Sequence, residues 1–234
     1  MQCGRRRRKM GFNIAIDGPA GAGKSTIAKL AAKELSFIYV DTGAMYRTIG
    51  LYMTRIGVDL NDREAVAAHV QEAQVSISYQ DGEQQVLLNG ENVSNLIRGE
   101  AVGAMASAVS RHPEVRGHLL DLQRKLAREC DVLMDGRDIG TCILPNADLK
   151  IFLTAAPEVR AQRRYLEQKS KGENCTFEEV LKKVIDRDYQ DSHREVAPLK
   201  QADDAMLVDT SNLTIQESAD TIVRLAKERM AAKE

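Results

Sequence analysis

The fold is decided by the stretch Asn13-Ile14-Ala15-Ile16-Asp17-Gly18-Pro19-Ala20-Gly21-Ala22-Gly23-Lys24-Ser25-Thr26. Its segment Gly18-x-x-x-x-Gly23-Lys24-Ser25 matches the phosphate-binding loop pattern in full, between a strand-like run and a helix-like run over residues 27–35. Glycines let the backbone wrap a phosphate with its N–H groups pointing inward, Lys24 supplies positive charge, and Ser25 offers a hydroxyl to Mg²⁺. We therefore expect a nucleoside triphosphate to bind at Gly18, Pro19, Ala20, Gly21, Ala22, Gly23, Lys24, Ser25 and Thr26, helped by the helix dipole.

The composition limits the classes of partner. The 33 lysines and arginines nearly balance the 34 aspartates and glutamates, so bulk charge predicts no nucleic-acid or membrane partner. The four cysteines have neither CxxC spacing nor a metal-site pattern and are interpreted as free thiols in a reducing compartment. No apolar run approaches the length of a membrane span, and the N-terminus lacks the apolar segment of a secretory signal. These features predict a soluble, cytoplasmic protein that can bury a full core.

The basic stretch Arg5–Lys9 allows two interpretations. It could be an arm that touches nucleic acid, or residues 1–11 could be a disordered extension before an ordered domain that begins near Phe12. No aromatic or periodic pattern supports the arm, so we favour the disordered extension.

A second strand is expected at residues 37–40, where β-branched and aromatic residues follow the first helix. Strand, phosphate loop, helix and strand in this order open a parallel α/β sheet, in which ligands bind at the carboxyl ends of the strands. Thr42 is a candidate cap for a helix over residues 44–56. Tyr46 and Arg47 lie in its first turn, and we favour a phosphate site for a second substrate over an ordinary helix pair.

The pattern changes between residues 59 and 97. A helix over residues 61–73, capped by Asn61 or Asp62, precedes a strand over 75–79 that alternates with a period of two. Asp81-Gly82 is a hairpin turn signal, and residues 85–88 form the returning strand. Because an antiparallel hairpin does not belong inside a parallel sheet, we interpret residues 59–97 as an insertion that forms a small lobe.

A central strand is predicted at residues 132–135, after two helices at 98–110 and 113–129. It ends in Asp135, which we expect to hold Mg²⁺ directly or through water as the acidic partner of the phosphate loop. The run Gly136-Arg137-Asp138-Ile139-Gly140 then carries two ionisable residues from the strand end into a cleft. Ionisable residues flanked by glycines at such a point indicate a functional role.

Three arginines crowd one face of the helix that follows a strand over residues 149–153. They are Arg160, Arg163 and Arg164, at spacings of three and four residues. Such a row of cations repels itself unless an anion binds, which favours a phosphate clamp over a solvated helix face. Residues 171–174 are predicted to be a mobile hinge after this helix.

The helix over residues 176–193 carries a second polar face with Arg187, Asp191 and Arg194. Asp188 lies off this face and is interpreted as a solvated surface charge. A strand over 206–209 and an amphipathic helix over 215–230 follow.

The predicted site combines a phosphate loop, a Mg²⁺ carboxylate and six arginines. Phosphoryl transfer needs mainly positioning and neutralisation of the charge on the transferring group. The sequence lacks the Asn-Lys-x-Asp run of guanine-nucleotide switches. So many cations predict two phosphorylated substrates, and hence a small kinase that acts on a monophosphate. The arginines are Arg47, Arg137, Arg160, Arg163, Arg187 and Arg194.

From about Phe12 to the C-terminus, the sequence resembles the bacterial cytidylate kinases, which phosphorylate CMP and dCMP with ATP. The matching motifs are Asp17-Gly18-Pro19-Ala20-Gly21-Ala22-Gly23-Lys24-Ser25, Asp41-Thr42-Gly43-Ala44-Met45-Tyr46-Arg47, Asp135-Gly136-Arg137-Asp138-Ile139-Gly140, and Arg187-Asp188-Tyr189 with Ala197-Pro198-Leu199. The resemblance implies a three-layer α/β P-loop NTPase fold with a central parallel sheet. Its core would comprise residues 12–58 and 98–234, with a monophosphate-binding insertion at 59–97 that contains the hairpin and a short helical lid at about 157–174.

The resemblance also implies a role for each matched residue. The residues implied to bind CMP are Thr42, Tyr46, Arg47, Ser107, Arg116, Arg137, Asp138, Arg187, Asp191 and Arg194. The lid arginines implied to bind ATP are Arg160, Arg163 and Arg164. The residues implied in catalysis are Lys24, Asp135, Arg137, Arg187 and Arg194, with Ser25 and Asp135 as Mg²⁺ ligands. Cytosine offers an amine donor and two acceptors, so Asp138 is matched to the amine and Ser107 and Arg116 to the acceptors.

Two other functions stay open. Another small P-loop kinase, acting on UMP, AMP or a small alcohol such as shikimate, would use the same loop. A nucleotide-dependent switch would place the arginines on a nucleic acid, which the balanced charge disfavours. The expected partners are therefore ATP and CMP or dCMP, with Mg²⁺ as cofactor, no nucleic acid, no membrane, and a monomeric state implied by the resemblance.

Overall fold

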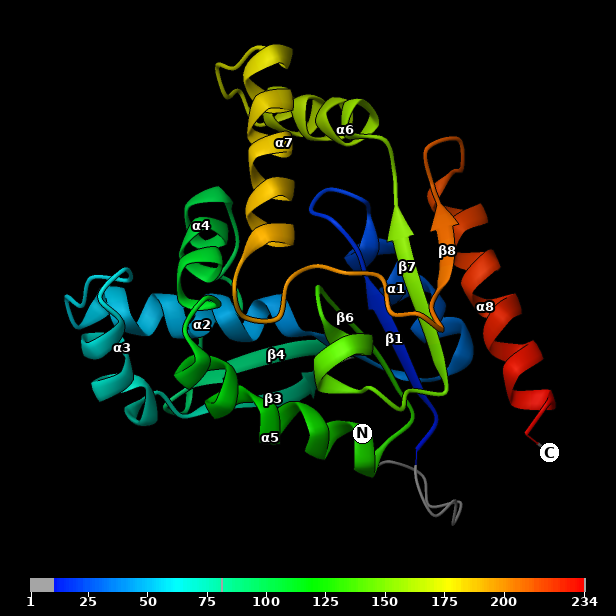
Figure 1. Cartoon of the computed structure of the whole chain (residues 1–234), viewed down its shortest axis with the longest axis horizontal. Helices are drawn as coiled ribbons and strands as arrows, with labels where there is room; N and C mark the ends of the chain where they lie inside the picture. The colour runs from blue at the N-terminus through cyan, green and yellow to red at the C-terminus, as the bar shows by residue number, and fades with distance from the viewer. Residues whose placement is uncertain (1–10, 81, 234) are drawn as a thin grey trace. The chain divides into compact units, whose positions relative to one another are not determined.

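The computed structural model describes residues 11–80 and 82–233 (Figure 1). The predicted disordered extension and the basic stretch Arg5–Lys9 lie outside these residues, apart from Gly11. The described chain forms two compact units. We call residues 11–12 and 38–132 the hairpin unit, and residues 13–37 and 133–233 the loop unit.

A five-stranded parallel sheet has the strand order β2-β6-β1-β7-β8. Its strands, in chain order, are β1 Asn13–Asp17, β2 Ile38–Asp41, β6 Val132–Gly136, β7 Leu149–Thr154 and β8 Met206–Asp209. β1 pairs in parallel with β7, and β7 pairs in parallel with β8. Strands in the middle of a parallel sheet are buried on both faces, which explains why their sequences are almost continuously apolar. The predicted parallel α/β fold is therefore confirmed.

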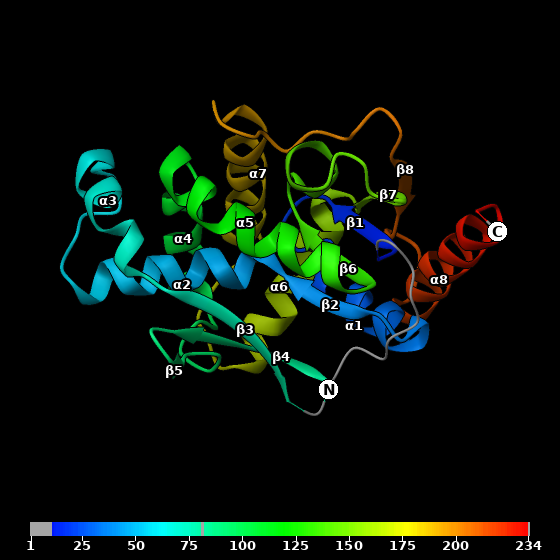
Figure 2. The ribbon, with the colours of Figure 1, turned by 90° about the horizontal axis from the view of Figure 1, so that it is seen from below.

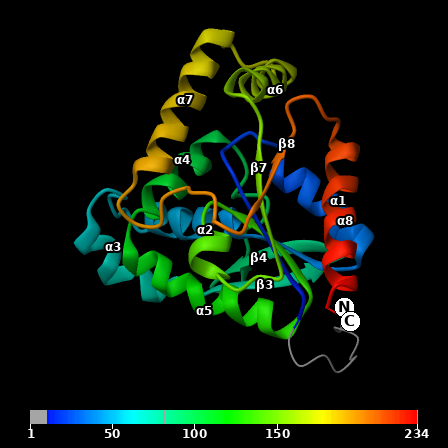
Figure 3. The ribbon, with the colours of Figure 1, turned by 45° about the vertical axis from the view of Figure 1, so that its right-hand side comes forward.

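Helices cover the sheet within the loop unit. Helix α1 (Lys24–Leu35) and the last helix, α8 (Ile215–Ala231), pack against each other and lie side by side (Figure 3). Two further helices, α6 (Pro157–Ser170) and α7 (Phe177–His193), pack together through Ala161, Val180 and Val184. The sequence did not predict the π-helical turn Ile139–Ile143, which follows β6.

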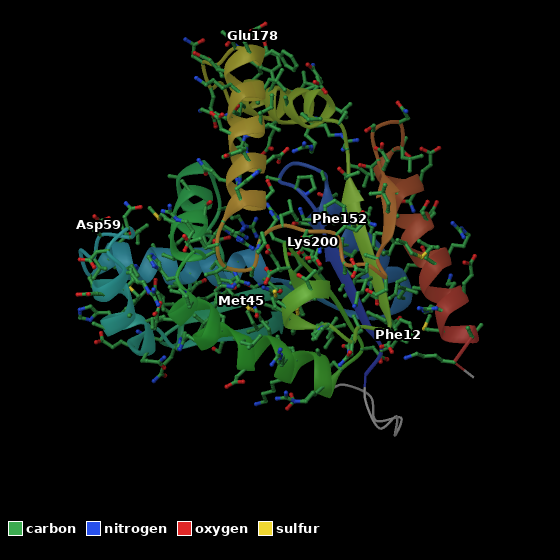
Figure 4. The ribbon with its side chains drawn as sticks, viewed as in Figure 1. Phe12, Met45, Asp59, Phe152, Glu178 and Lys200 are labelled. Carbon is green, nitrogen blue, oxygen red and sulfur yellow. The ribbon has the colours of Figure 1, made fainter. Side chains whose placement is uncertain are left out.

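The hairpin unit contains the predicted antiparallel hairpin (Figure 2). Its strands are β3 Val75–Gln80, β4 Glu83–Leu88 and the short β5 Glu91–Asn92. Its helices are α2 Thr42–Arg55, α3 Arg63–His69, α4 Glu100–Val109 and α5 Pro113–Glu129. In α2, Met45 is fully buried, whereas Asp59 beyond its end is exposed (Figure 4). The hairpin prediction is confirmed, and the boundaries of an insertion at 59–97 stay a prediction.

Two details of the helices differ from the sequence prediction. Thr42 is not the cap of α2, because the helix begins at Thr42 and the Asp41 carboxylate accepts the Ala44 N–H at 2.9 Å. The helix expected over residues 61–73 ends at His69 and continues as a short 3₁₀ turn, Val70–Glu72. Among the described residues, no helix is long and apolar enough to cross a membrane.

Candidate active site

The phosphate loop, residues Gly18–Ser25, connects β1 to α1 in the loop unit. A side chain at Gly18 is excluded, because its Cβ would lie 1.9 Å from the Leu153 carbonyl oxygen at a φ of +150°. Gly23 also has a positive φ, of +86°, immediately before the helix. The Lys24 ammonium donates to the Pro19 carbonyl at 2.7 Å, so the lysine side chain extends back over the phosphate loop. This backbone shape and the start of α1 are suited to an anion.

Lys24 lies among charges of both signs. Lys24 is only 6% exposed, and burial lowers the pKa of its ammonium well below the usual value. The positive charge of Arg137 lowers this pKa further, whereas the carboxylates of Asp135, Asp191 and Asp17 raise it. A bound phosphate would add negative charge beside Lys24 and so favour its protonated form.

The Ser25 hydroxyl donates to the Asp135 carboxylate at 3.0 Å. Asp135 is buried at the end of β6, as the sequence predicted for the acidic partner of the loop. A hydroxyl and a carboxylate are oxygen ligands of the kind that Mg²⁺ prefers. In the described part of the chain, no group of three or more His, Cys, Asp or Glu residues could hold a metal. Mg²⁺ usually keeps water ligands and binds substrate phosphates together with one or two protein oxygens.

Asp17 holds the turn that follows β6, a role that the sequence analysis missed. Its two carboxylate oxygens accept the N–H groups of Ile139 and Gly140, each at 2.7 Å. Burial raises the pKa of this carboxyl to about 6, and the two amide bonds oppose the rise. The only sequence signal was an acidic residue at the buried end of a strand. Asp17 thus fixes the backbone of the turn that carries Arg137 and Asp138.

The predicted acceptor residues of the loop unit include two ion pairs, and the Asp191 carboxylate also interacts electrostatically with Arg187 and Arg194. Arg137 donates from Nε to the Asp191 carboxylate at 2.9 Å, and a guanidinium nitrogen of Arg194 lies 3.5 Å from the Asp138 carboxylate. Burial alone would raise the pKa of Asp191, but the guanidiniums of Arg137, Arg187 and Arg194 lower it below its usual value. The structure therefore brings together five predicted residues that lie on two segments more than 40 residues apart in the sequence.

Arg160 of α6 has a protein anion as its partner. Its guanidinium forms a two-point ion pair with Asp188 of α7, with distances of 2.9 and 2.6 Å. It also donates to the carbonyls of Ala155 at 2.8 Å and of Ala20 in the phosphate loop at 3.1 Å. The interpretation of Asp188 as a solvated surface charge was wrong. Arg160 connects α6, α7 and the phosphate loop.

Arg163 also has partners within the protein. It donates to the Thr210 carbonyl at 2.8 Å, and a second nitrogen lies 3.4 Å from the Thr210 hydroxyl. Arg164 is half-buried on the same helix. The repulsion that favoured a phosphate clamp is thus reduced by Asp188 and by carbonyl oxygens, and the assignment of these arginines to ATP stays a prediction.

The predicted acceptor residues of the hairpin unit lie on α2, α4 and α5. Arg47 donates to the Asp41 carboxylate at 2.8 Å, and its buried Nε has no hydrogen-bond partner among the described residues. The Arg116 guanidinium lies 5.6 Å from the centre of the Tyr46 ring, a cation–π contact. Thr42 is buried, and Ser107 is half-buried on α4. Within this unit, Arg47 therefore keeps donor capacity for an incoming anion.

Comparison with known proteins gives one consistent family. Residues 14–228 match the family model described as cytidylate kinase. A cytidylate kinase from Caldicellulosiruptor saccharolyticus is 49% identical over 214 residues, which cover 92% of this chain and 95% of that protein. A cytidylate kinase from Geobacter sp. strain M21 is 46% identical over 225 residues, which cover 96% of each chain.

A solved structure of an uncharacterized protein from Eubacterium ventriosum is similar in fold alone. It has a TM-score of 0.52 and 11% identity, and the match covers 92% of this chain and 98% of that one. The family model covers most of the sequence, and the two kinases exceed 45% identity over nearly its full length. This chain belongs to the cytidylate kinase family.

Proposed function

We propose that this protein transfers the terminal phosphoryl group of ATP to CMP and dCMP, giving CDP or dCDP and ADP. One observation carries the proposal beyond family membership. In the loop unit, Ser25 beside Lys24 donates to the Asp135 carboxylate at 3.0 Å, and Arg137, two residues after Asp135, pairs with Asp191 at 2.9 Å. The lysine expected to bind the donor phosphates and the residues expected to bind the acceptor therefore share one charged neighbourhood, as a transfer between two phosphates requires.

The proposed acceptor contacts follow the chemistry of each residue. The CMP phosphate would bind Thr42, Tyr46, Arg47 and Arg137, and the sugar hydroxyls would bind Arg187 and Asp191. The Asp138 carboxylate would accept from the cytosine amine, with Ser107 and Arg116 as donors to the other edge of the base. Arg194 would lie near the transferred phosphate, where its positive charge stabilises the transition state.

No protein base is needed for this reaction. An oxygen of the acceptor phosphate is itself a nucleophile, so Lys24 and the arginines act by aligning the two phosphates and neutralising their charge. Mg²⁺, held by Ser25 and Asp135, would supply further neutralisation of the ATP phosphates. The arginines of α6 would act on the donor side, Arg160 through its contact with the phosphate loop. The lid at about 157–174 would close to exclude water.

We also propose four properties that the sequence favours. These are the monomeric state, the absence of nucleic-acid and membrane partners, the cytoplasmic location and the domain boundaries.

An ADP-release assay with CMP, dCMP, UMP and AMP as acceptors tests the function. We expect ATP-dependent ADP release with CMP and dCMP at rates well above those with UMP and AMP. A reaction with ATP alone is the control, because it measures hydrolysis without an acceptor. The proposal is wrong if AMP is the best acceptor, or if no acceptor raises ADP release above this control.

A further inference from the structure

The strand β2 lies at the edge of the five-stranded sheet, so on one side it has no neighbouring strand within residues 11–80 and 82–233. The Ile38 N–H donates to the Asp131 carbonyl at 2.9 Å, on the side of the chain that continues into β6. Successive residues of an extended strand direct their backbone groups to opposite edges. Tyr39 and Asp41 therefore direct theirs to the free edge, where buried polar groups need other partners.

Two side chains of the antiparallel hairpin supply these partners. The Tyr79 hydroxyl donates to the Tyr39 carbonyl at 3.1 Å. The Gln84 carboxamide accepts the Asp41 N–H at 2.8 Å and donates to the Asp41 carbonyl at 3.3 Å. Tyr79 and Gln84 are directly opposed in the register of β3 and β4, so they lie on the same face of the hairpin. A carboxamide has an acceptor oxygen and N–H donors, as a peptide group does. Gln84 therefore makes the two hydrogen bonds to Asp41 that the backbone of a neighbouring strand would make.

Gln84 binds the backbone of Asp41, and the Asp41 side chain in turn binds Arg47. One oxygen of Asp41 caps α2 at the Ala44 N–H, and the other accepts from the Arg47 guanidinium at 2.8 Å. Arg47 keeps a buried Nε without a partner in the described part of the chain. The orientation of this arginine therefore depends on the position of Asp41, and that position depends in part on Gln84.

We infer that Gln84 is a positioning residue for the acceptor phosphate, and that the hairpin fixes Arg47 by holding the end of β2. This inference rests on the proposed function, since it takes the phosphate monoester of CMP as the ligand of Arg47. Gln84 itself touches no substrate. Its effect passes through the Asp41 peptide and carboxylate to the guanidinium.

Three variants test this role. Gln84→Ala removes both hydrogen bonds to Asp41, and Gln84→Met removes them while keeping a side chain of similar length. Gln85→Ala is the matched control, because among the described residues the neighbouring Gln85 side chain accepts from Asn92 of the same hairpin and has no hydrogen bond to Asp41. The Michaelis constants for CMP and ATP are measured for each, together with the midpoint of thermal unfolding.

We expect both Gln84 variants to raise KM for CMP about fivefold to tenfold and to leave KM for ATP within about twofold of wild type. Gln85→Ala should leave both constants near wild type. The inference is overturned if Gln84→Met and Gln85→Ala have the same KM for CMP. It is also overturned if the Gln84 variants raise both Michaelis constants equally, because that result indicates general loss of structure.

A double-mutant cycle with Arg47→Ala tests the route of the effect. If Gln84 acts through Arg47, Gln84→Met should change KM for CMP by less than about twofold in the Arg47→Ala background. An effect as large as in wild type would contradict the inference.

Hydrogen exchange gives a measurement that needs no turnover. Gln84→Met should accelerate exchange of the Asp41 and Ala44 amides, whereas Gln85→Ala should not, and unchanged exchange at Asp41 would overturn the bracing role. A wild-type enzyme that fails to phosphorylate CMP would refute the proposed function alone, since exchange still decides whether Gln84 holds this peptide.

Discussion

Asp17→Asn should change how stability depends on pH, in a direction opposite to that of most acidic side chains. Asp17 is 5% exposed, and burial raises the pKa of its carboxyl to about 6 from the usual 3.8. Its two oxygens each accept a different amide, from Ile139 and Gly140. Asparagine has nearly the same shape, carries no charge and has only one side-chain oxygen. The variant therefore removes the charge and one acceptor while it keeps the volume.

The magnitude follows from the two pKa values of Asp17. Between 3.8 and about 6, the folded state binds a proton that the unfolded state lacks, so the wild-type free energy of unfolding falls as pH rises through this window. Above the folded pKa, this contribution is constant. At about 1.36 kcal/mol for each pH unit, the whole window corresponds to about 3 kcal/mol. Between about pH 5 and about pH 7.5, the wild-type free energy of unfolding should fall by about 1.4 kcal/mol of this total.

Urea unfolding of both proteins at these two pH values measures the effect. The difference between wild type and variant cancels other titrating groups, such as Asp191. From about pH 5 to about pH 7.5, we expect the free energy of unfolding of Asp17→Asn to rise by about 1.4 kcal/mol relative to that of wild type. At the higher pH, kcat/KM for CMP should nevertheless fall, because the turn that carries Arg137 and Asp138 loses one amide acceptor. A stability difference that is equal at both pH values would refute this reasoning.

Three further substitutions test the loop unit. Gly18→Ala should lower the free energy of unfolding by about 3 kcal/mol in urea titrations, because the new Cβ would overlap the Leu153 carbonyl, and wild-type stability would contradict this. Asp188→Asn leaves the buried Arg160 without its anion, and thermal unfolding should show a loss of about 2 kcal/mol with a raised KM for ATP. An unchanged KM for ATP would separate Arg160 from the donor site. Asp135→Asn should raise the Mg²⁺ concentration for half-maximal rate about tenfold, with KM for CMP unchanged, and an identical Mg²⁺ titration would exclude Asp135 as a ligand.

Much of the fold could be predicted because its signals are local. The strands β1 and β6 are continuous apolar runs that end at glycine or at an acidic residue, and the phosphate loop has a fixed spacing. The hairpin alternates with a period of two around a turn signal. The prediction that Thr42 caps α2 was wrong. Asp41 and Thr42 are both good capping residues, and their order along the chain does not decide between them. In the folded protein, the Asp41 carboxylate both caps the helix and accepts a hydrogen bond from Arg47.

The missed residues act across long distances in sequence. Asp17 binds amides that lie 122 and 123 residues further along the chain, and Gln84 binds a peptide 43 residues before it. The π-helical turn after β6 is a single turn, which has no periodic signature in sequence. Such contacts depend on which elements the fold brings together, and no residue pattern around Asp17 or Gln84 specifies their partners.

The arginines show why the charge on one helix face cannot be judged from that helix alone. The spacing of Arg160, Arg163 and Arg164 places three cations on one face of α6, yet the counter-ion of Arg160 is Asp188 of α7, 28 residues away in the sequence. Every nitrogen of the Arg160 guanidinium already donates within the protein, whereas Arg47 has a buried Nε without a partner among the described residues. An incoming phosphate therefore gains more at Arg47, where it satisfies a donor, than at Arg160, where it must replace Asp188. On this criterion we propose that Arg47 binds the ligand and that Arg160 acts by holding the phosphate loop.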